Sequence, residues 1–301
     1  MRAMKKHRAI ALLVTVFFII AISIPLGISL KQLKEASSEV ASEIFMLQST
    51  LVVEDVLNIL KNSKELEEVV QESDVKALWH FLSKVTFIPF QSNGLEVSIE
   101  IASARSKFNP NTLLETNTTH PLGLYLSNFD IKEDYVALLL ENMGGIKEDN
   151  SYNSDIFEQN PTLFRDYIVS QKHLDEINNF YMQNSHENAI AKIDFEKLFY
   201  FSSQKNYFID VNYATKEVWR LMLGCSDERA KQLFSGGGLY AKEEDLALSE
   251  AEAEMLKRFK TTFYEAHLDV KIRIGRSNQS AFVRFEYDMK TKKGSNFVYE
   301  I

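Results

Sequence analysis

Residues 10–30 read IALLVTVFFIIAISIPLGISL, a run of twenty-one residues without a charged side chain. Fourteen of them are Ile, Leu, Val or Phe. A helix of this length spans about 30 Å, the thickness of the hydrocarbon core of a bilayer. Four basic residues precede it (Arg2, Lys5, Lys6 and Arg8), which favours a short cytoplasmic N-terminus and an extracytoplasmic remainder. The sequence therefore predicts a single-pass membrane anchor.

Three interpretations of this segment compete. A cleaved secretory signal has an apolar run of about 7–15 residues, whereas this run is longer and Lys31 follows it directly. A plain signal anchor fits the hydropathy equally well. The third interpretation extends the helix past the membrane, because apolar residues recur at spacings of three and four (Leu33, Ala36, Val40, Ile44, Leu47 and Leu51). No Gly occurs from 28 to 93 and no Pro from 26 to 88, so this amphipathic helix is predicted to continue to about residue 61.

A basic leader (residues 1–9), an apolar segment and a continuous amphipathic helix together resemble the type IV pilin and pseudopilin family. The resemblance implies that prepilin peptidase cuts between Ala9 and Ile10. Ala9 stands where the family usually has Gly, and Val14 stands at the fifth position after the cut, where the family usually has Glu. A carboxylate inside a membrane is costly without a partner, so an apolar residue there suits the subunit at a filament tip. Within the family, the large minor pseudopilin K of type II secretion systems is the member known to lack this Glu.

Strand patterns follow the helical region. Residues 84–90 are rich in β-forming residues, and residues 94–103 alternate strictly, with Gln91-Ser-Asn-Gly as a hairpin turn between them. Three further strands are predicted at the end of the chain, over residues 268–274, 280–289 and 296–301. The predicted fold class is α+β: a long N-terminal helix packed on a small antiparallel sheet, as in pilins, formed by residues 31–105 and 263–301.

Residues 106–262 are predicted to form a large, all-α domain inserted between these strands. Helices are expected over residues 130–142, 160–171 and 174–182. A pair of short helices within about 205–235 begins at Asn212 or Thr215 and resembles the helical hairpins of sterile-alpha-motif-like and helix-hairpin-helix modules. In the K pseudopilins a helical domain is inserted into the pilin fold in this way, so the resemblance implies the same arrangement here.

Two short motifs support the resemblance. Residues 107–111 match a Lys/Arg-Phe-Asn-x-Asn run that follows the first strands of the K pseudopilins, and residues 209–218 match a second signature of that family. The second motif departs from the family at Asp210, which replaces Asn, and at Tyr213, which replaces Thr. The residues that carry the two motifs are Lys107, Phe108, Asn109, Asn111, Ile209, Asn212, Ala214, Glu217 and Val218.

Composition and motifs argue against an enzyme and against nucleic acid. The chain has 301 residues and a net charge of −8, and phosphate binding needs a basic face. The single Cys225 and six histidines provide neither a disulfide framework nor a zinc pattern. Gly236-Gly-Gly lacks the Lys-Ser/Thr of a phosphate loop, and His186-Glu187 lacks the second His of a metalloprotease helix. No catalytic residue is predicted.

No cofactor is expected, and calcium is the one metal ion for which the sequence offers candidate ligands. The K pseudopilin is known to bind calcium in its helical domain, and carboxylate oxygens are suitable calcium ligands. Asp130, Glu133 and Asp134 are the candidate ligands in this chain. None of the acidic clusters has the spacing of a twelve-residue calcium loop, which favours ordinary solvated charge.

The resemblance implies a non-enzymatic minor pseudopilin at the tip of a periplasmic pseudopilus that assists protein export across the outer membrane. It would cross the inner membrane once, with its C-terminal domain in the periplasm. Implied partners are the I and J pseudopilins, the filament shaft, prepilin peptidase, the inner-membrane secretion platform and the lipid bilayer. Two alternatives stay open: a minor pilin of a type IV pilus or competence system, and a signal-anchored periplasmic domain of another activity.

Overall fold

The structure is a computed structural model that describes residues 40–72, 75–92, 94–186, 188–276 and 278–300. The predicted leader and apolar segment, together with Leu33 and Ala36, lie outside these residues. Within the described ranges, no helix combines the length and the apolar character needed to cross a membrane. The structure therefore tests the predicted N-terminal helix only from residue 40 onward.

A five-stranded antiparallel sheet with the order β1-β2-β5-β6-β7 forms the centre of the molecule. Its strands are β1 (Phe87–Ser92), β2 (Leu95–Ser103), β5 (His267–Arg276), β6 (Gln279–Asp288) and β7 (Lys293–Glu300). These correspond to the five predicted strands, with two shifted starts. The first strand begins at Phe87 because the preceding helix runs to Val85, and the last begins at Lys293 rather than residue 296.

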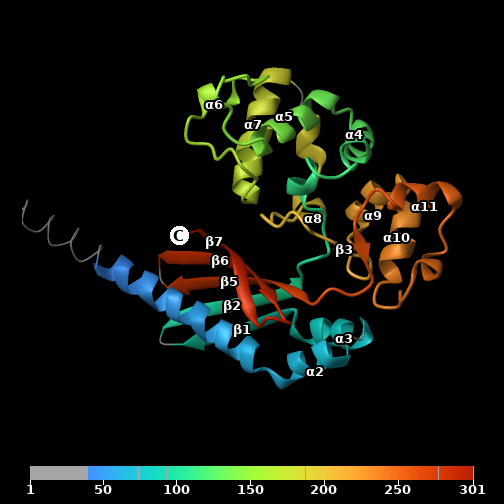
Figure 1. Cartoon of the computed structure of the whole chain (residues 1–301). Helices are drawn as coiled ribbons and strands as arrows, with labels where there is room; N and C mark the ends of the chain where they lie inside the picture. Colours follow the sequence, from blue (N-terminus) through green and yellow to red (C-terminus); the bar gives the residue numbers. More distant parts are fainter. Residues whose placement is uncertain (1–39, 73–74, 93, 187, 277, 301) are drawn as a thin grey trace, which may run out of the picture.

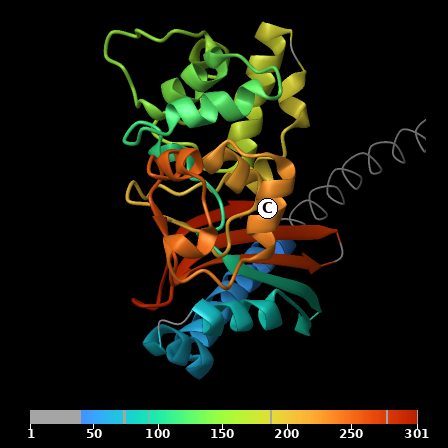
Figure 2. The same cartoon turned by 90° about the vertical axis from the view of Figure 1, so that its right-hand side faces the viewer.

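The N-terminal helix (residues 40–62 as described) packs on one face of this sheet. Phe45, Val53 and Val56 are buried there against the alternating apolar residues of the central strands, such as Val270 and Phe285. Two short helices, α2 (Lys64–Glu72) and α3 (Val75–Val85), complete this layer. Figure 2 shows the helical layer below the sheet and the rest of the chain above it. The predicted α+β class is thus confirmed for the described residues.

The chain leaves the sheet after β2 and returns at β5, although these two strands pair directly. Residues 104–266 therefore form an insert, slightly longer than the predicted 106–262, with a hydrophobic core of its own. Its helices are α4 (Thr119–Ser127), α5 (Glu133–Met143), α6 (Ile156–Gln159), α7 (Gln171–Ser185), α8 (Phe195–Leu198), α9 (Lys216–Leu223), α10 (Asp227–Ser235) and α11 (Glu250–Leu256), with 3-10 turns η1 (Pro110–Thr112), η2 (Ala189–Lys192) and η3 (Glu243–Leu246).

The sequence predicted an all-α insert, and this prediction was wrong in one respect, because the insert also contains strands. Two short strands, β3 (Ile209–Asp210) and β4 (Thr261–Thr262), pair in parallel within it. Their period-2 pattern is too short to detect in a sequence, and only the fold brings them together. The chain returns to the sheet through β4, while β3 leads on to α9 and lies beside the start of the insert (Figure 1).

The predicted pair of short helices is present as α9 and α10. The Thr215 hydroxyl accepts a hydrogen bond from the Val218 N–H (3.2 Å), and the Ser226 hydroxyl accepts one from the Arg229 N–H (3.3 Å). Gly224 ends α9 with a φ of 61°, a left-handed conformation that glycine adopts without steric cost. Local capping chemistry therefore determines both helix starts and the turn between them.

The prediction of a helix over residues 160–171 was wrong. The helix nearest to it, α6, ends at Gln159, and the Asn160 N–H closes it on the Ile156 carbonyl at 2.9 Å. Pro161 therefore follows a helix instead of starting one. Farther along, the Asn111 side chain accepts from the Ile168 N–H (2.8 Å) and donates to the Ile168 carbonyl (2.9 Å), which takes both of its backbone groups away from a helix.

Candidate functional site

The described N-terminal helix has a second apolar face, which points away from the sheet. Val40, Ile44, Leu47 and Leu51 are 55%, 46%, 63% and 51% exposed. They belong to the stripe predicted from the sequence, so this stripe is real but is not the face that packs on the sheet. Past Leu51 the outward positions are polar, because Glu54, Asp55 and Asn58 occupy them. The apolar stripe therefore lies in the N-terminal half of the described helix, and Ile59 is a separate exposed apolar side chain farther along it.

The first family-motif segment holds the insert together. Phe108 is buried, bridges to Phe199 in a short parallel pairing, and packs its ring 5.9 Å from that of Phe259. Asn109 is fully buried, and its amide donates to the carbonyls of Ser202 (2.9 Å) and Gln204 (3.2 Å). A buried amide of this kind satisfies backbone groups of loops that have no partner in regular structure. Asn109 is therefore an architectural residue.

Asn212, in the second motif, has the same role. Its Oδ1 accepts from the N–H groups of Gly238 and Tyr240, both at 3.0 Å. Its Nδ2 donates to the carbonyls of Tyr240 (2.9 Å) and Phe263 (2.8 Å). One side chain thus fixes the loop after α10 and the segment that leads back to the sheet. The apolar members of this motif, Ile209, Ala214 and Val218, are all buried.

The structure brings the second motif against the two residues that directly precede the first. The Asp210 N–H donates to the Arg105 carbonyl (2.9 Å), and the Thr215 N–H donates to the Ser106 carbonyl (3.0 Å). Two motif residues, Lys107 and Glu217, are only partly buried; Lys107 lines a cavity between the insert and the sheet, and Glu217 lies in the first turn of α9. The motifs therefore mark the place where the insert joins the sheet.

Asp210, which replaces the family's Asn, is buried at this joint. Its carboxylate accepts from the N–H groups of Asn212 (3.0 Å) and Glu265 (2.9 Å). Burial raises the pKa of Asp210 to about 7, and the two backbone donors oppose that rise. The side chain links the second motif to the segment that enters β5.

A buried ion pair at the same joint was not predicted from the sequence. The Arg105 guanidinium lies 2.6 Å from the Glu286 carboxylate of β6, and both side chains are almost fully buried. Gln204 and Asn296 donate further hydrogen bonds to this carboxylate, both at 3.3 Å. Burial lowers the pKa of Arg105, but the hydrogen bond to Glu286 and the charge interactions with Glu286, Tyr207 and Tyr200 together outweigh burial, so the pKa is raised. Because 181 positions separate Arg105 from Glu286, no local pattern could have revealed the pair.

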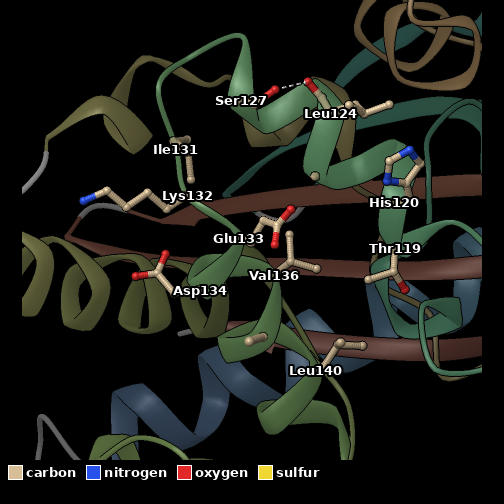
Figure 3. A pocket seen from close by; sticks show the side chains of 12 residues that line it. Thr119, His120, Leu124, Ser127, Ile131, Lys132, Glu133, Asp134, Val136 and Leu140 are labelled. Atoms are coloured by element: carbon tan, nitrogen blue, oxygen red, sulfur yellow. Dashed lines mark hydrogen bonds between the residues drawn. The ribbon is translucent and has the colours of Figure 1, made fainter.

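The candidate calcium ligands do not converge. Asp130 precedes α5 with a φ of 63°, while Glu133 and Asp134 lie in the first turn of that helix. Figure 3 shows the carboxylates of Glu133 and Asp134 pointing to different sides, and Asp134 accepts a hydrogen bond from the Tyr181 hydroxyl (3.2 Å). Across the described part of the chain, no group of three or more His, Cys, Asp or Glu residues could hold a metal ion. Glu133 and Asp134 instead line an open groove of about 1030 Å³ between α4 and α5.

Comparison with known proteins supports the fold. No protein-family model and no curated protein matches the sequence. The structure is similar to a chain in the crystal structure of the GspK-GspI-GspJ complex of the Type 2 Secretion System of enterotoxigenic Escherichia coli, with a TM-score of 0.54 and 13% identity. The match covers 89% of this chain and 97% of that chain. The likeness thus takes in both the sheet and the insert.

Proposed function

We propose that this protein is a minor pseudopilin of a type II secretion system, resembling the K component, and that it acts at the tip of a periplasmic pseudopilus to assist protein export. The role is structural rather than enzymatic. Residues 10–30 would hold the protein in the inner membrane until prepilin peptidase and the secretion platform transfer it into the filament. The similarity to a chain of the GspK-GspI-GspJ complex supports the fold that this role needs. Val14 supports a position with no subunit above it.

The observation that carries the proposal is the exposed stripe Val40, Ile44, Leu47 and Leu51. Full burial of one such side chain stabilises a complex by about 1.5–3 kcal/mol. A contiguous apolar surface on an otherwise acidic protein marks a contact with another protein or a membrane. Since the opposite face of the helix is already packed on the sheet, the stripe is free to contact neighbouring helices. The I and J pseudopilins are the partners that we propose for it.

The test is assembly of the full-length chain with its I and J pseudopilins. Leu47→Glu and Leu51→Glu place a charge in the centre of the stripe, and each is expected to abolish copurification of the partners and protein export. The matched control is Asn58→Glu, which adds the same charge to the same helix beyond the stripe. This control is expected to assemble and export normally.

Thermal unfolding separates assembly from folding. Leu47 and Leu51 are exposed, so their Glu variants are expected to keep the melting temperature of the parent. If both variants still copurify with the partners and support export, the stripe is not an assembly surface and the proposal loses its main support.

A further inference from the structure

A cavity of about 320 Å³ lies between the insert and the face of the sheet opposite the N-terminal helix. Its walls come from the outward-facing residues of β5, β6 and β7, from the start of α7, and from the segment around α8, which lies above the sheet in Figure 1. Five cationic side chains line it: Lys107, Lys172, Lys271, Arg273 and Arg284. The cavity thus gathers five cations in a chain whose net charge is −8.

Three of these cations already have partners. Arg284 pairs with Asp269 at 2.7 Å, while Lys271 and Arg273 both approach Glu100, at 3.2 and 3.6 Å. Lys107 differs, because within the described residues no hydrogen bond or ion pair engages its ammonium group, although three carboxylates line the same cavity (Asp175, Glu196 and Glu300). A partly buried cation without a partner is costly to hold.

The surroundings of Lys107 increase that cost. Burial lowers the pKa of Lys107, and the nearby positive charges of Lys271 and Arg284 lower it further. The negative charge of Asp269 opposes this lowering. Lys172 lies in the first turn of α7, which contains no acidic residue. An anion in the cavity would therefore be attracted both by Lys107 and by its cationic neighbours.

Three aromatic rings also line the cavity, next to Ser170, Gln171 and Val298. Phe199 and Phe201 are buried in the insert, and Phe282 of β6 also faces the cavity, with the Arg273 guanidinium 5.5 Å from its ring centroid. The three rings lie beside the charged side chains, so a ligand with both an apolar group and a charge could contact the two kinds of wall at once. A bare inorganic anion would leave these rings without contact.

We propose that this cavity binds a carboxylate attached to an apolar group, with Lys107 as its charge partner and the phenylalanine rings as the apolar walls. Such a carboxylate can belong to a free small acid or to the end of a polypeptide. The inference goes beyond the proposed assembly role and does not depend on it.

Calorimetric titration of the full-length protein tests the proposal with four probes: N-acetylphenylalanine, 3-phenylpropanoate, N-acetylphenylalaninamide and inorganic phosphate. Binding of both carboxylates indicates a free acid as the ligand, and binding of N-acetylphenylalanine alone indicates a polypeptide terminus. N-acetylphenylalaninamide lacks the negative charge, and phosphate lacks the aromatic ring. Each is expected to bind at least about tenfold more weakly than the carboxylates, because the first loses a charged hydrogen bond and the second loses the apolar contact.

Lys107→Met is expected to weaken carboxylate binding by at least about tenfold, while the melting temperature stays the same or rises because a poorly solvated charge is removed. The matched control is Lys205→Met, which removes a lysine charge outside the cavity, where Lys205 pairs with Glu115. Equal affinity in parent and Lys107→Met, equal affinity for acid and amide, or no carboxylate binding up to the solubility limit would each overturn the proposal.

Discussion

The backbone of Gly238, in the loop after α10, packs against the indole ring of Trp79 in α3. A Cβ atom added to Gly238 would lie 2.5 Å from Cδ2 of Trp79 and 2.7 Å from its Cγ. The ring of Tyr213 lies on the same indole, with 5.4 Å between centroids. This contact is a second joint between the sheet part and the insert, and it leaves no room for a side chain at Gly238, whereas a side chain at Gly236 would meet Tyr240.

Gly238→Ala is expected to destabilise the protein for two reasons. Its φ of 81° is strained for any side chain, at about 1–3 kcal/mol, and the clash with Trp79 adds about 1–3 kcal/mol of overpacking. The matched control is Gly145→Ala, which has a similar φ of 72° but open space around the added Cβ. Urea unfolding should show a larger loss for Gly238→Ala; equal losses would mean that the Trp79 contact contributes nothing.

The ion pair between Arg105 and Glu286 gives a second prediction. Arg105→Met leaves the Glu286 carboxylate buried without its main partner, which costs about 3–5 kcal/mol. The double variant Arg105→Met/Glu286→Leu should recover part of that loss, because no buried charge remains unpaired. As a control, Lys197→Met breaks the exposed pair with Asp194 and should leave the midpoint of denaturant unfolding almost unchanged. A double variant less stable than Arg105→Met would contradict this account.

His173 predicts how stability depends on pH. Burial lowers the pKa of His173 to about 4, compared with ~6.5 in an unfolded chain. Below about pH 6.5 the unfolded state therefore binds more protons than the folded state. The contribution of His173 to the free energy of unfolding is complete above about pH 6.5 and is lost as the pH falls toward 4. Between about pH 7 and pH 5 the loss from this group is about 2 kcal/mol.

His173→Asn should remove this loss, since an amide oxygen can accept the Val169 N–H that now bonds to Nδ1 at 3.3 Å. The measurement is the melting temperature at several pH values for parent and variant. His186→Asn serves as the control, because His186 is exposed at the end of α7 with a φ of 56° that Asn tolerates well. If the melting temperatures of the parent and of His173→Asn fall in parallel with pH, His173 does not titrate in this way.

Processing at the N-terminus is testable by mass analysis. With active prepilin peptidase the mature chain is expected to begin at Ile10, and without the enzyme at Met1. Ala9→Gly restores the residue that the family usually has there and should be cut at least as well, whereas Ala9→Leu should remain uncut because the position requires a small residue. A chain that keeps Met1 in the presence of active peptidase would contradict the pseudopilin interpretation.

Local physics determined most of the elements of this protein. Alternating apolar residues specify β2, β5 and β6, because side chains in a strand alternate between faces. The Thr215 and Gly224 caps specify α9, because each satisfies or redirects backbone groups within a few residues. These features depend on neighbours in the chain, and the sequence alone was enough to predict them.

Tertiary structure decided which surfaces meet. The stripe containing Leu47 and the face containing Phe45 are both apolar, and only the presence of the sheet determines that Phe45 is buried and Leu47 exposed. Likewise, Asn111 prevents a helix at Ile168, and Arg105 finds Glu286, through contacts between residues 57 and 181 positions apart. Such contacts form only after the insert folds onto the sheet. The residues that form the joint between the two parts are single Asn, Arg, Glu, Trp and Gly residues far apart in the sequence. They form no periodic pattern, so the sequence alone could not show that they meet.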